Sequence, residues 1–381
     1  MAGLVAIALA APRGGDALFG AIAIAATVTG VVACLSPGLR ARRPVLVRFA
    51  GTVASVGALL LATAVLSTTT DYNLAIAAAV AVVLVGLSLL TGVSGQISRG
   101  NGAFMGVGAY AMAIWANHHS TTPIVVSLLI SCACGAVVGL LLGLPATRLR
   151  GPYLAGMTLA FAVAFGAILI QFASWTGGDS GLQLPHSVNP PRWVLDLFGA
   201  GTSPLRTSTI WLADLAVVVA GVAFFFMANL FASRVGRAMR LVRDHDVAAE
   251  LVGVSLSRTR VLAFVVSATY AALGGALLTI INNAVSEPTY GFVLSITILA
   301  VVVIGGIGTV GAAVIGALIY AYSTTVINWF VNQTGLNPQG NLASQLNGII
   351  FGGLLILTMI FAPMGVVGGL RALARRARKL T

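Results

Sequence analysis

Long apolar stretches separated by short polar segments run along the whole chain. The longest apolar stretches begin near Ala17, Phe49, Tyr72, Pro123, Tyr153, Ile210 and Val261. Shorter or glycine-interrupted apolar runs begin near Ala103, Gly291, Val310 and Asn347. A helix needs about 20 apolar residues to cross a bilayer. The pattern therefore predicts an all-α polytopic membrane protein of about 10–11 transmembrane helices, with Gly-rich broken or re-entrant segments.

The composition supports this prediction. Hydrophobic residues make up 58% of the chain and charged residues only 8%, whereas soluble domains carry roughly 25% charged residues. The 45 glycines suit closely packed transmembrane helices. The formal net charge of +12 does not indicate nucleic-acid binding, because the arginines lie almost wholly between apolar runs.

The charges of the loops predict the orientation. Four segments are basic: the arginines at 40, 42, 43 and 48, the pair Arg148 and Arg150, residues 233–260, and the tail 371–381. The loops near Asp71, at 174–209 and near Glu287 are neutral or acidic. Because basic loops stay in the cytoplasm, we expect eleven crossings with the N-terminus outside and the C-terminus inside. The outer loop 174–209 is either a docking surface for an extracytoplasmic protein or a passive connection.

Lys379 is the only lysine in the chain, and Leu380 follows it. A Gly-rich phosphate loop requires Gly-Lys-Ser/Thr at the start of a helix. This chain therefore has no such loop, and any ATP hydrolysis that drives it belongs to another chain.

A first Gly-rich motif runs from Thr91 to Tyr110. Irregular polar backbone at membrane depth is tolerated only where protein or a watery cavity surrounds it, and broken helices of this kind form substrate sites in transporters. Gln96, Ser98 and Asn101 are the pathway candidates, and Gly92, Gly95 and Gly100 are the structural glycines. The alternative is a cytoplasmic turn followed by a tightly packed Gly-rich helix.

A second Gly-rich motif, residues 304–311, contains Gly305, Gly306 and Gly308. It matches a dinucleotide-binding fingerprint loosely, but no strand–helix alternation surrounds it and its flanks are apolar. We interpret it as a helix break or a close helix crossing.

The basic segment 233–254 predicts one short amphipathic helix between two spans. Asp246 and Glu250 stand four residues apart on one face, with Leu241, Val242, Val247, Ala248 and Leu251 as its apolar positions. Gly253 suits the end of a helix. Topology alone would explain the arginines, but it would not explain acidic residues gathered beside an apolar stripe. A docking helix for a cytoplasmic partner is favoured.

These stretches together resemble the second permease type of the branched-chain amino acid ABC importers. The resemblance rests on Gly92–Tyr110, Gly151–Ala155 with Thr158–Phe161, Thr176–Gly178, Gly236–Gly253 and Val302–Gly316, in the family's order over residues 85–320. Three residues depart from the family's pattern. Asn101 stands where the family often has His, Arg99 stands where an apolar residue is usual, and Asp179 stands where Ser or Thr is commoner. The first 70 residues or so fall outside it.

The resemblance implies a transport subunit and its partners. It implies a second permease, identical or different, two ATPase subunits that bind ATP and Mg, and an extracytoplasmic solute-binding protein. It also implies that residues 244–253 form the coupling helix, seated in a groove of the ATPase. The residues expected to contribute to the coupling are Arg240, Asp244, Asp246, Ala248, Ala249, Glu250 and Gly253. The expected domains are an N-terminal transmembrane extension (1–70), a permease core (71–370) and a basic cytoplasmic tail (371–381).

The resulting hypothesis is a cell-membrane permease, not an enzyme, for branched-chain or other small amino acids, with no cofactor or metal in this chain. Weaker pathway candidates are Gln171, Asn282 and Asn283. Urea or short amides remain alternative substrates, and an ion-coupled carrier remains the alternative class. Ion-coupled carriers usually place an ionisable residue inside the membrane, but Asp71, Asp214 and Glu287 are expected near the outer ends of spans. The four histidines lie in predicted loops and form no acid–base or metal cluster with the carboxylates.

Overall fold

The computed structural model describes residues 44–63, 68–119, 122–148, 152–184, 204–334 and 353. The long α-helices in this part are α3 (Pro44–Thr63), α4 (Thr68–Ser88), α5 (Asn101–His118), α6 (Ile124–Ala146), α7 (Pro152–Gln171), α10 (Pro204–Ala232), α13 (Leu256–Asn282), α14 (Phe292–Gly305) and α15 (Val310–Thr334). The short elements are η2 (Leu89–Val93), α8 (Ala173–Thr176), η3 (Gly178–Ser180), α11 (Arg234–Asp244), α12 (Asp246–Leu251), η5 (Glu287–Tyr290) and strands β1 (Leu182–Gln183) and β2 (Ala284–Val285).

Six helices of the described chain are long and apolar enough to cross a membrane: 68–93, 124–146, 153–171, 208–232, 256–282 and 287–305. Shorter apolar helices cover 51–60 and 310–323. The chain is an all-α polytopic membrane protein, as the hydrophobic pattern predicts. The predicted spans near Ala17 and Asn347 and the tail 371–381 lie outside the described residues.

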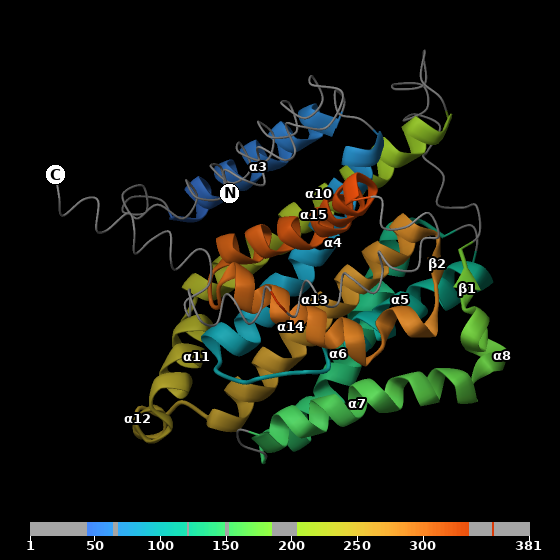
Figure 1. The fold of residues 1–381 in the computed structure, drawn as a ribbon. Coiled ribbons are helices and arrows are strands. Elements are labelled where there is room, and N and C mark those ends of the chain that lie inside the picture. The colour runs from blue at the N-terminus through green and yellow to red at the C-terminus, as the bar shows by residue number, and fades with distance from the viewer. Residues whose placement is uncertain are drawn as a thin grey trace.

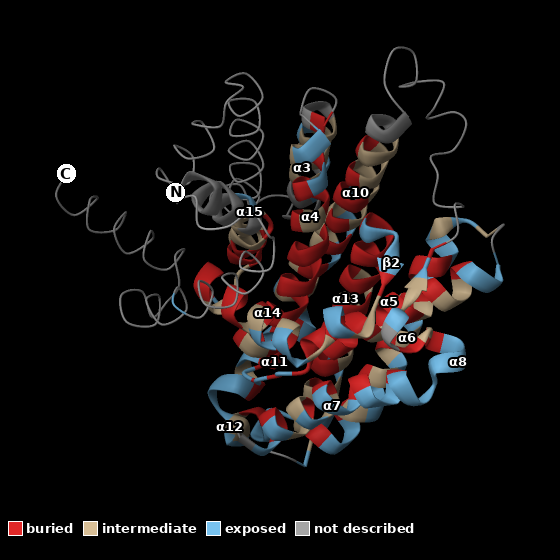
Figure 2. Cartoon of the chain, turned by 45° about the vertical axis from the view of Figure 1, so that its right-hand side comes forward, coloured by how far each residue is buried: buried red, intermediate tan, exposed pale blue. Residues whose placement is uncertain are grey.

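The central helix is α13, which packs against α4, α5 and α6 (Figures 1 and 2). Small residues allow these close contacts. A side chain at Gly275 would meet the backbone of Met105 in α5, and one at Gly108 would meet the backbone of Ala272. Helices in a membrane associate through such small-residue packing because lipid offers no hydrophobic driving force between them.

The helix directions create two distinct ends. Helix α11 carries Arg234, Arg237, Arg240 and Arg243, and we call the end where α11 and α12 lie the arginine-rich end. Strands β1 and β2 and helix α8 lie at the opposite end (Figure 1). Helix α4 runs from the opposite end, where the Tyr72 hydroxyl donates to Asn282 Oδ1 (2.8 Å), toward the arginine-rich end, where Gln96 meets the Arg260 carbonyl. Helix α5 returns, and Asn117 donates to the Gln183 carbonyl (3.2 Å).

The opposite end is closed by backbone pairing. Strand β1 pairs antiparallel with β2, with Leu182 opposite Val285 and Gln183 opposite Ala284. The amide of Leu184 donates to the Asn283 carbonyl (3.0 Å), which extends the pairing. This pairing joins the segment after α7 to the segment after α13. Residues 185–203, which make up most of the predicted outer loop, lie outside the described residues.

Candidate transport pathway and coupling site

The first Gly-rich motif forms the connection between α4 and α5. Helix α4 widens into the π-turn η2, in which the Ser94 amide donates to the Leu89 carbonyl (2.9 Å) and the Gln96 amide to the Leu90 carbonyl (2.9 Å). Gly95 has φ +73°, a conformation that favours glycine. Residues 94–100, which we call the connecting segment, then lead into α5. The helical path is therefore broken here, while α5 is continuous and largely buried.

The three pathway candidates of this motif are buried, and two of them, Ser98 and Asn101, lie together. Gln96 is 7% exposed, and Ser98 and Asn101 are each 1% exposed. Ser98 Oγ lies 3.5 Å from Asn101 Oδ1. Within the described part of the chain, neither Gln96 Oε1 nor Asn101 Nδ2 has a hydrogen-bond partner. Buried polar atoms are nearly always paired, so this cluster has capacity to bind a further polar group at the start of α5.

Glycines bring the two Gly-rich motifs into contact. A side chain at Gly92 would collide with the backbone of Gly308, which lies in the turn between α14 and α15. In that turn Gly306 and Gly308 both have positive φ, +114° and +87°. Gly100 approaches α7, since a Cβ there would lie 2.6 Å from the Thr158 carbonyl oxygen. The second motif is therefore a tight helix–helix turn that packs on the first.

The basic segment contains two helices instead of one. Ser233 caps α11 by accepting from the Gly236 amide (3.3 Å), and α12 follows after His245, whose backbone is extended. The prediction of a single amphipathic helix was therefore wrong. The predicted apolar stripe is divided as well, because Val242 is 3% exposed while Val247 is 72% exposed. A residue in extended conformation between two helices rotates the second relative to the first, which helical spacing in the sequence does not reveal.

Helix α12 presents an apolar surface away from the protein. Its exposed apolar side chains are Val247 and Leu251 (85% exposed), and Val252 (75%) follows at its C-terminal cap. Ala249 is buried and faces the protein. Gly253 ends the helix with φ +82°, and the amides of Gly253 and Val254 donate to the carbonyls of Glu250 and Ala249. This is the glycine-terminated helix end that the sequence predicts.

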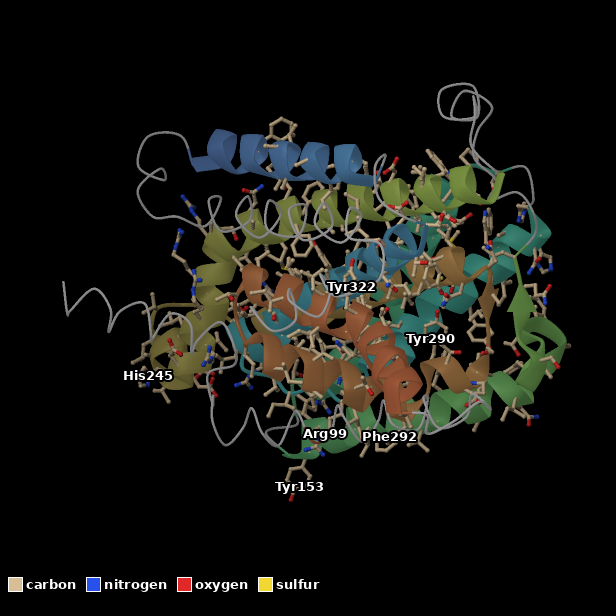
Figure 3. All side chains as sticks on the ribbon, turned by 45° about the horizontal axis from the view of Figure 1, so that its top comes forward. Arg99, Tyr153, His245, Tyr290, Phe292 and Tyr322 are labelled. Carbon is tan, nitrogen blue, oxygen red and sulfur yellow. The ribbon has the colours of Figure 1, made fainter. Side chains whose placement is uncertain are left out.

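The remaining coupling candidates lie around this surface. Glu250, Arg240 and Asp244 are exposed, and Ala248 is partly exposed. The Arg240 guanidinium donates to the Phe231 carbonyl (3.0 Å) at the end of α10. His245 lies at the same end of the molecule (Figure 3). The arrangement is a short exposed platform built on α10, α11 and the start of α13.

The structure does not bring all the predicted pathway residues together. Gln171, Asn282 and Asn283 are exposed at the opposite end. Asn282 is 22 residues beyond Arg260 on α13, which corresponds to about 33 Å at 1.5 Å per residue. The two groups are therefore separate sites at the two ends of the bundle. The side chain of Arg99 is exposed (Figure 3), and the side chain of Asp179 lies outside the described residues.

Two arginines that sequence reasoning did not single out join the platform to the connecting segment. Arg243 donates to the carbonyl of Gly92, and Arg260 forms an ion pair with Asp246 (2.7 Å). The sequence gives no local signal for either contact, because the partners are 151 and 14 residues apart. Among the described residues, no group of His, Cys, Asp and Glu side chains is arranged to hold a metal ion.

Comparison with known proteins matches residues 69–359 to the family of branched-chain amino acid transport system permease components. The LivM permease proteins of Salmonella typhimurium and Escherichia coli K12 are each 30% identical over 296 residues, which cover 74% of this chain and 66% of the relative. The chain thus spans just under two thirds of the length of these relatives. The Autoinducer 2 import permease LsrC of an Enterobacter species is 28% identical over 258 residues, 67% of this chain and 69% of that protein. No solved structure matches the chain.

Proposed function

The chain belongs to the family of branched-chain amino acid transport system permease components, and from this premise we propose that it is the transmembrane permease of an ATP-driven importer. Its task is to form the path for a small amino acid. The relatives named LivM are high-affinity branched-chain amino acid permeases, and we propose the same substrate class here. The proposal includes location in the cell membrane with the arginine-rich end in the cytoplasm.

The exposed surface of α12 is the observation that carries the proposal. Leu251 and Val252 are among the most exposed large apolar residues of the described chain, yet they follow Glu250 directly in a segment that also exposes Arg240 and Asp244, at the end that we assign to the cytoplasm. An apolar cluster in a charged surrounding marks an interaction site for a protein. Because the chain has no phosphate-binding loop, an ATPase subunit is the partner that the proposed function requires at this surface.

The assembly that we propose has two permease subunits, two ATPase subunits that carry ATP and Mg, and an extracytoplasmic solute-binding protein. The coupling platform comprises Arg240, Asp244, Asp246, Ala248, Ala249, Glu250 and Gly253. Residues 1–70 would form an N-terminal extension, residues 71–370 the permease core and residues 371–381 a cytoplasmic tail.

We place the substrate pathway at the connecting segment and the start of α5. Gln96, Ser98 and Asn101 supply donors and acceptors there, and the start of a helix carries a partial positive charge that favours a carboxylate. Gln171, Asn282 and Asn283 would contact solute at the opposite end. Residues 174–184 and 204–209, together with the rest of the outer loop, would lie toward the solute-binding protein.

The test is uptake by the complex, purified from its native membrane through a tag on this chain and reconstituted in vesicles. We expect labelled leucine to accumulate only when ATP is available to the ATPase subunits, and Glu250→Arg and Leu251→Asp to abolish both uptake and co-purification of the ATPase. Val53→Asp and Phe49→Asp would place a carboxylate in lipid and are therefore unsuitable as controls. The matched control is Glu287→Gln, at the opposite end, which we expect to retain the ATPase. Uptake by the chain alone, driven by an ion gradient without ATP, would contradict the proposal and support an ion-coupled carrier.

A further inference from the structure

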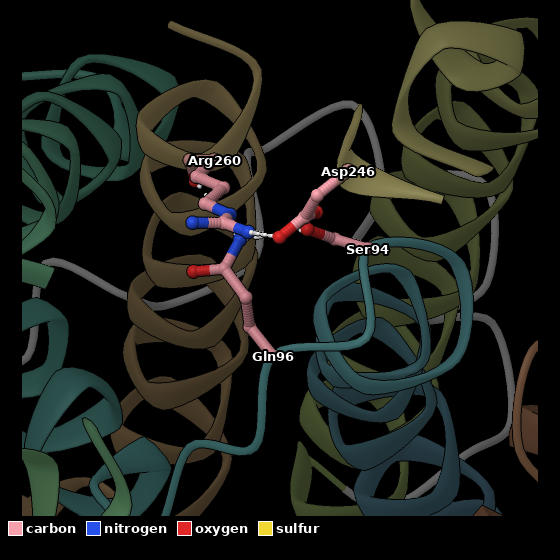
Figure 4. Close-up of polar contacts among 4 residues, drawn as sticks. All are labelled: Ser94, Gln96, Asp246 and Arg260. Atoms are coloured by element: carbon pink, nitrogen blue, oxygen red, sulfur yellow. Dashed lines mark hydrogen bonds and ion pairs between the residues drawn. The ribbon is translucent and has the colours of Figure 1, made fainter. Parts of the chain in front are cut away.

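Arg260, in the first turns of α13, is contacted from two sides. Its guanidinium Nη2 lies 2.7 Å from Asp246 Oδ2, at the first residue of α12. Its backbone carbonyl accepts a hydrogen bond from Gln96 Nε2 (3.2 Å), in the connecting segment. Gln96 Nε2 also donates to Ser94 Oγ (2.7 Å). One residue therefore joins the coupling platform to the connecting segment (Figure 4).

Arg243 forms a second connection between the same two regions. In a regular α-helix the Gln96 amide would donate to the Gly92 carbonyl, but after the π-turn it donates to the Leu90 carbonyl instead. The Arg243 guanidinium donates to this Gly92 carbonyl. The aliphatic part of Arg243 covers Gly95, where a Cβ would lie 2.8 Å from Arg243 Cγ. The last residue but one of α11 thus supports the end of α4 at its break.

The connecting segment is in turn bonded to α7, and the first turn of α5, into which it leads, is bonded to α14. The Arg99 amide donates to Thr158 Oγ1 in α7 (3.0 Å), and the Gly102 amide donates to Ser295 Oγ in α14 (3.0 Å). Gly92 packs on Gly308 in the turn that follows α14. A displacement of the connecting segment would therefore reach α7 and α14.

We propose that Arg260 and Arg243 are positioning residues that transmit movement of the α11–α12 platform to the connecting segment, and through it to α7 and α14. This inference rests on the proposed function, because it assumes that an ATPase moves the platform. The Arg260–Asp246 pair is suited to this role because its side chains are only 16% and 35% exposed, so water and salt screen it less than a fully exposed pair.

The competing route is the backbone itself. Helix α12 leads into α13 through residues 252–255, so α13 could move as a rigid rod without either arginine. The two routes differ in what happens when a side-chain contact is removed and the backbone is left intact. If the side chains transmit the movement, loss of the ion pair would disconnect the connecting segment from the platform. If the backbone transmits it, loss of the ion pair would leave transport unchanged.

The experiment uses the reconstituted complex with labelled leucine, and measures uptake per ATP hydrolysed. Arg260→Gln is expected to keep the ATPase bound and hydrolysing, while uptake per ATP falls about tenfold, as expected for a lost coupling free energy between two sites. Asp246→Asn, which breaks the same ion pair from the platform side, is expected to lower uptake per ATP as well. The reversed pair Asp246→Arg with Arg260→Asp is expected to restore most of this ratio. Arg258→Gln is the matched control, because Arg258 is exposed on the same turn and, unlike Arg260, does not pair with Asp246.

Two results would overturn the inference. One is wild-type uptake per ATP in both single variants; the other is failure of the reversed pair to recover any of the loss. Should either single variant fail to assemble, Arg243→Gln decides, since Arg243 is half-exposed: an unchanged ratio there overturns the inference, and a reduced ratio with the ATPase bound supports it. In all these cases, ATP-dependent uptake by the wild-type complex upholds the proposed function. A wild-type complex without ATP-dependent uptake overturns both the proposed function and this inference.

Discussion

Helix α13 is held by ionised side chains at its arginine-rich end and by backbone pairing at its opposite end. At the first end, Arg260 joins Asp246 through its side chain and Gln96 through its carbonyl. At the second, β2 continues from α13 into an antiparallel pair with β1, and Tyr72 donates to Asn282. Long flexible side chains can break and remake their contacts over several ångströms, whereas a strand pair fixes its register. The difference suits an end that moves with a partner and an end that remains in place.

The largest effect is expected where the two Gly-rich motifs cross, at the arginine-rich end. Gly92→Val would drive a side chain into the backbone of Gly308. Overpacking of this kind costs about 3 kcal/mol, so we expect a lower thermal unfolding midpoint in detergent and no uptake.

The control for this change is Gly156→Val, on the exposed face of α7, where a Cβ meets nothing within 4 Å. Its unfolding free energy should stay within about 0.5 kcal/mol of the wild type. Equal stability of the two variants would show that the motifs do not need their close crossing.

A smaller effect is expected at the opposite end. Gly181 has φ +70° and ψ −167°, a region essentially restricted to glycine, and Gly181→Ala should cost about 2 kcal/mol. Because the strain falls beside β1, hydrogen exchange of the Leu184 amide should accelerate, while the ATPase stays bound and hydrolysis is unaffected.

Gly291→Ala is the matched control, since Gly291 has ordinary φ and its Cβ would lie 3.8 Å from the nearest atom, the Pro288 carbonyl oxygen. If Gly181→Ala reduced binding of the ATPase, the two ends would not be independent and the comparison would fail.

The smallest effect concerns one hydrogen bond. Tyr72→Phe removes the donor to Asn282 Oδ1, and because Tyr72 is 41% exposed, we expect a loss of about 0.5 kcal/mol in the free energy of unfolding. Tyr153→Phe, at a side chain that is 76% exposed, should change nothing measurable. A Tyr72→Phe effect as large as that of Gly181→Ala would mean that side chains, not the strand pair, hold this end.

The membrane helices could be predicted because their signal is local. Stretches expected near Tyr72, Pro123, Tyr153, Ile210 and Val261 correspond to spans that begin at residues 68, 124, 153, 208 and 256. Hydropathy over about 20 residues is enough to identify such helices. The run near Gly291, expected to be short or glycine-interrupted, is interrupted at Gly291 between η5 and α14, and residues 287–305 together are long enough to cross a membrane.

The organisation of the coupling site was less accessible from the sequence. The break at His245 depends on one extended residue inside a segment with helical spacing. The contacts of Arg243 and Arg260 depend on which helices neighbour one another, and so does the separation of Gln96 from Asn282. Periodicity within one helix carries no information on these distances between helices.

The most direct test of the account places a spin label at residue 97 of the connecting segment, where the Ile97 side chain is 52% exposed. Cys34, Cys132 and Cys134 are first replaced by alanine, and the labelled Ile97→Cys chain is assembled with its ATPase. We predict that trapping ATP on the complex changes the mobility of the label, and that Arg260→Gln abolishes this change while hydrolysis continues. Two results would contradict the claim that the platform moves the connecting segment: the same change in label mobility in the Arg260 and Arg260→Gln complexes, or no change in label mobility in either.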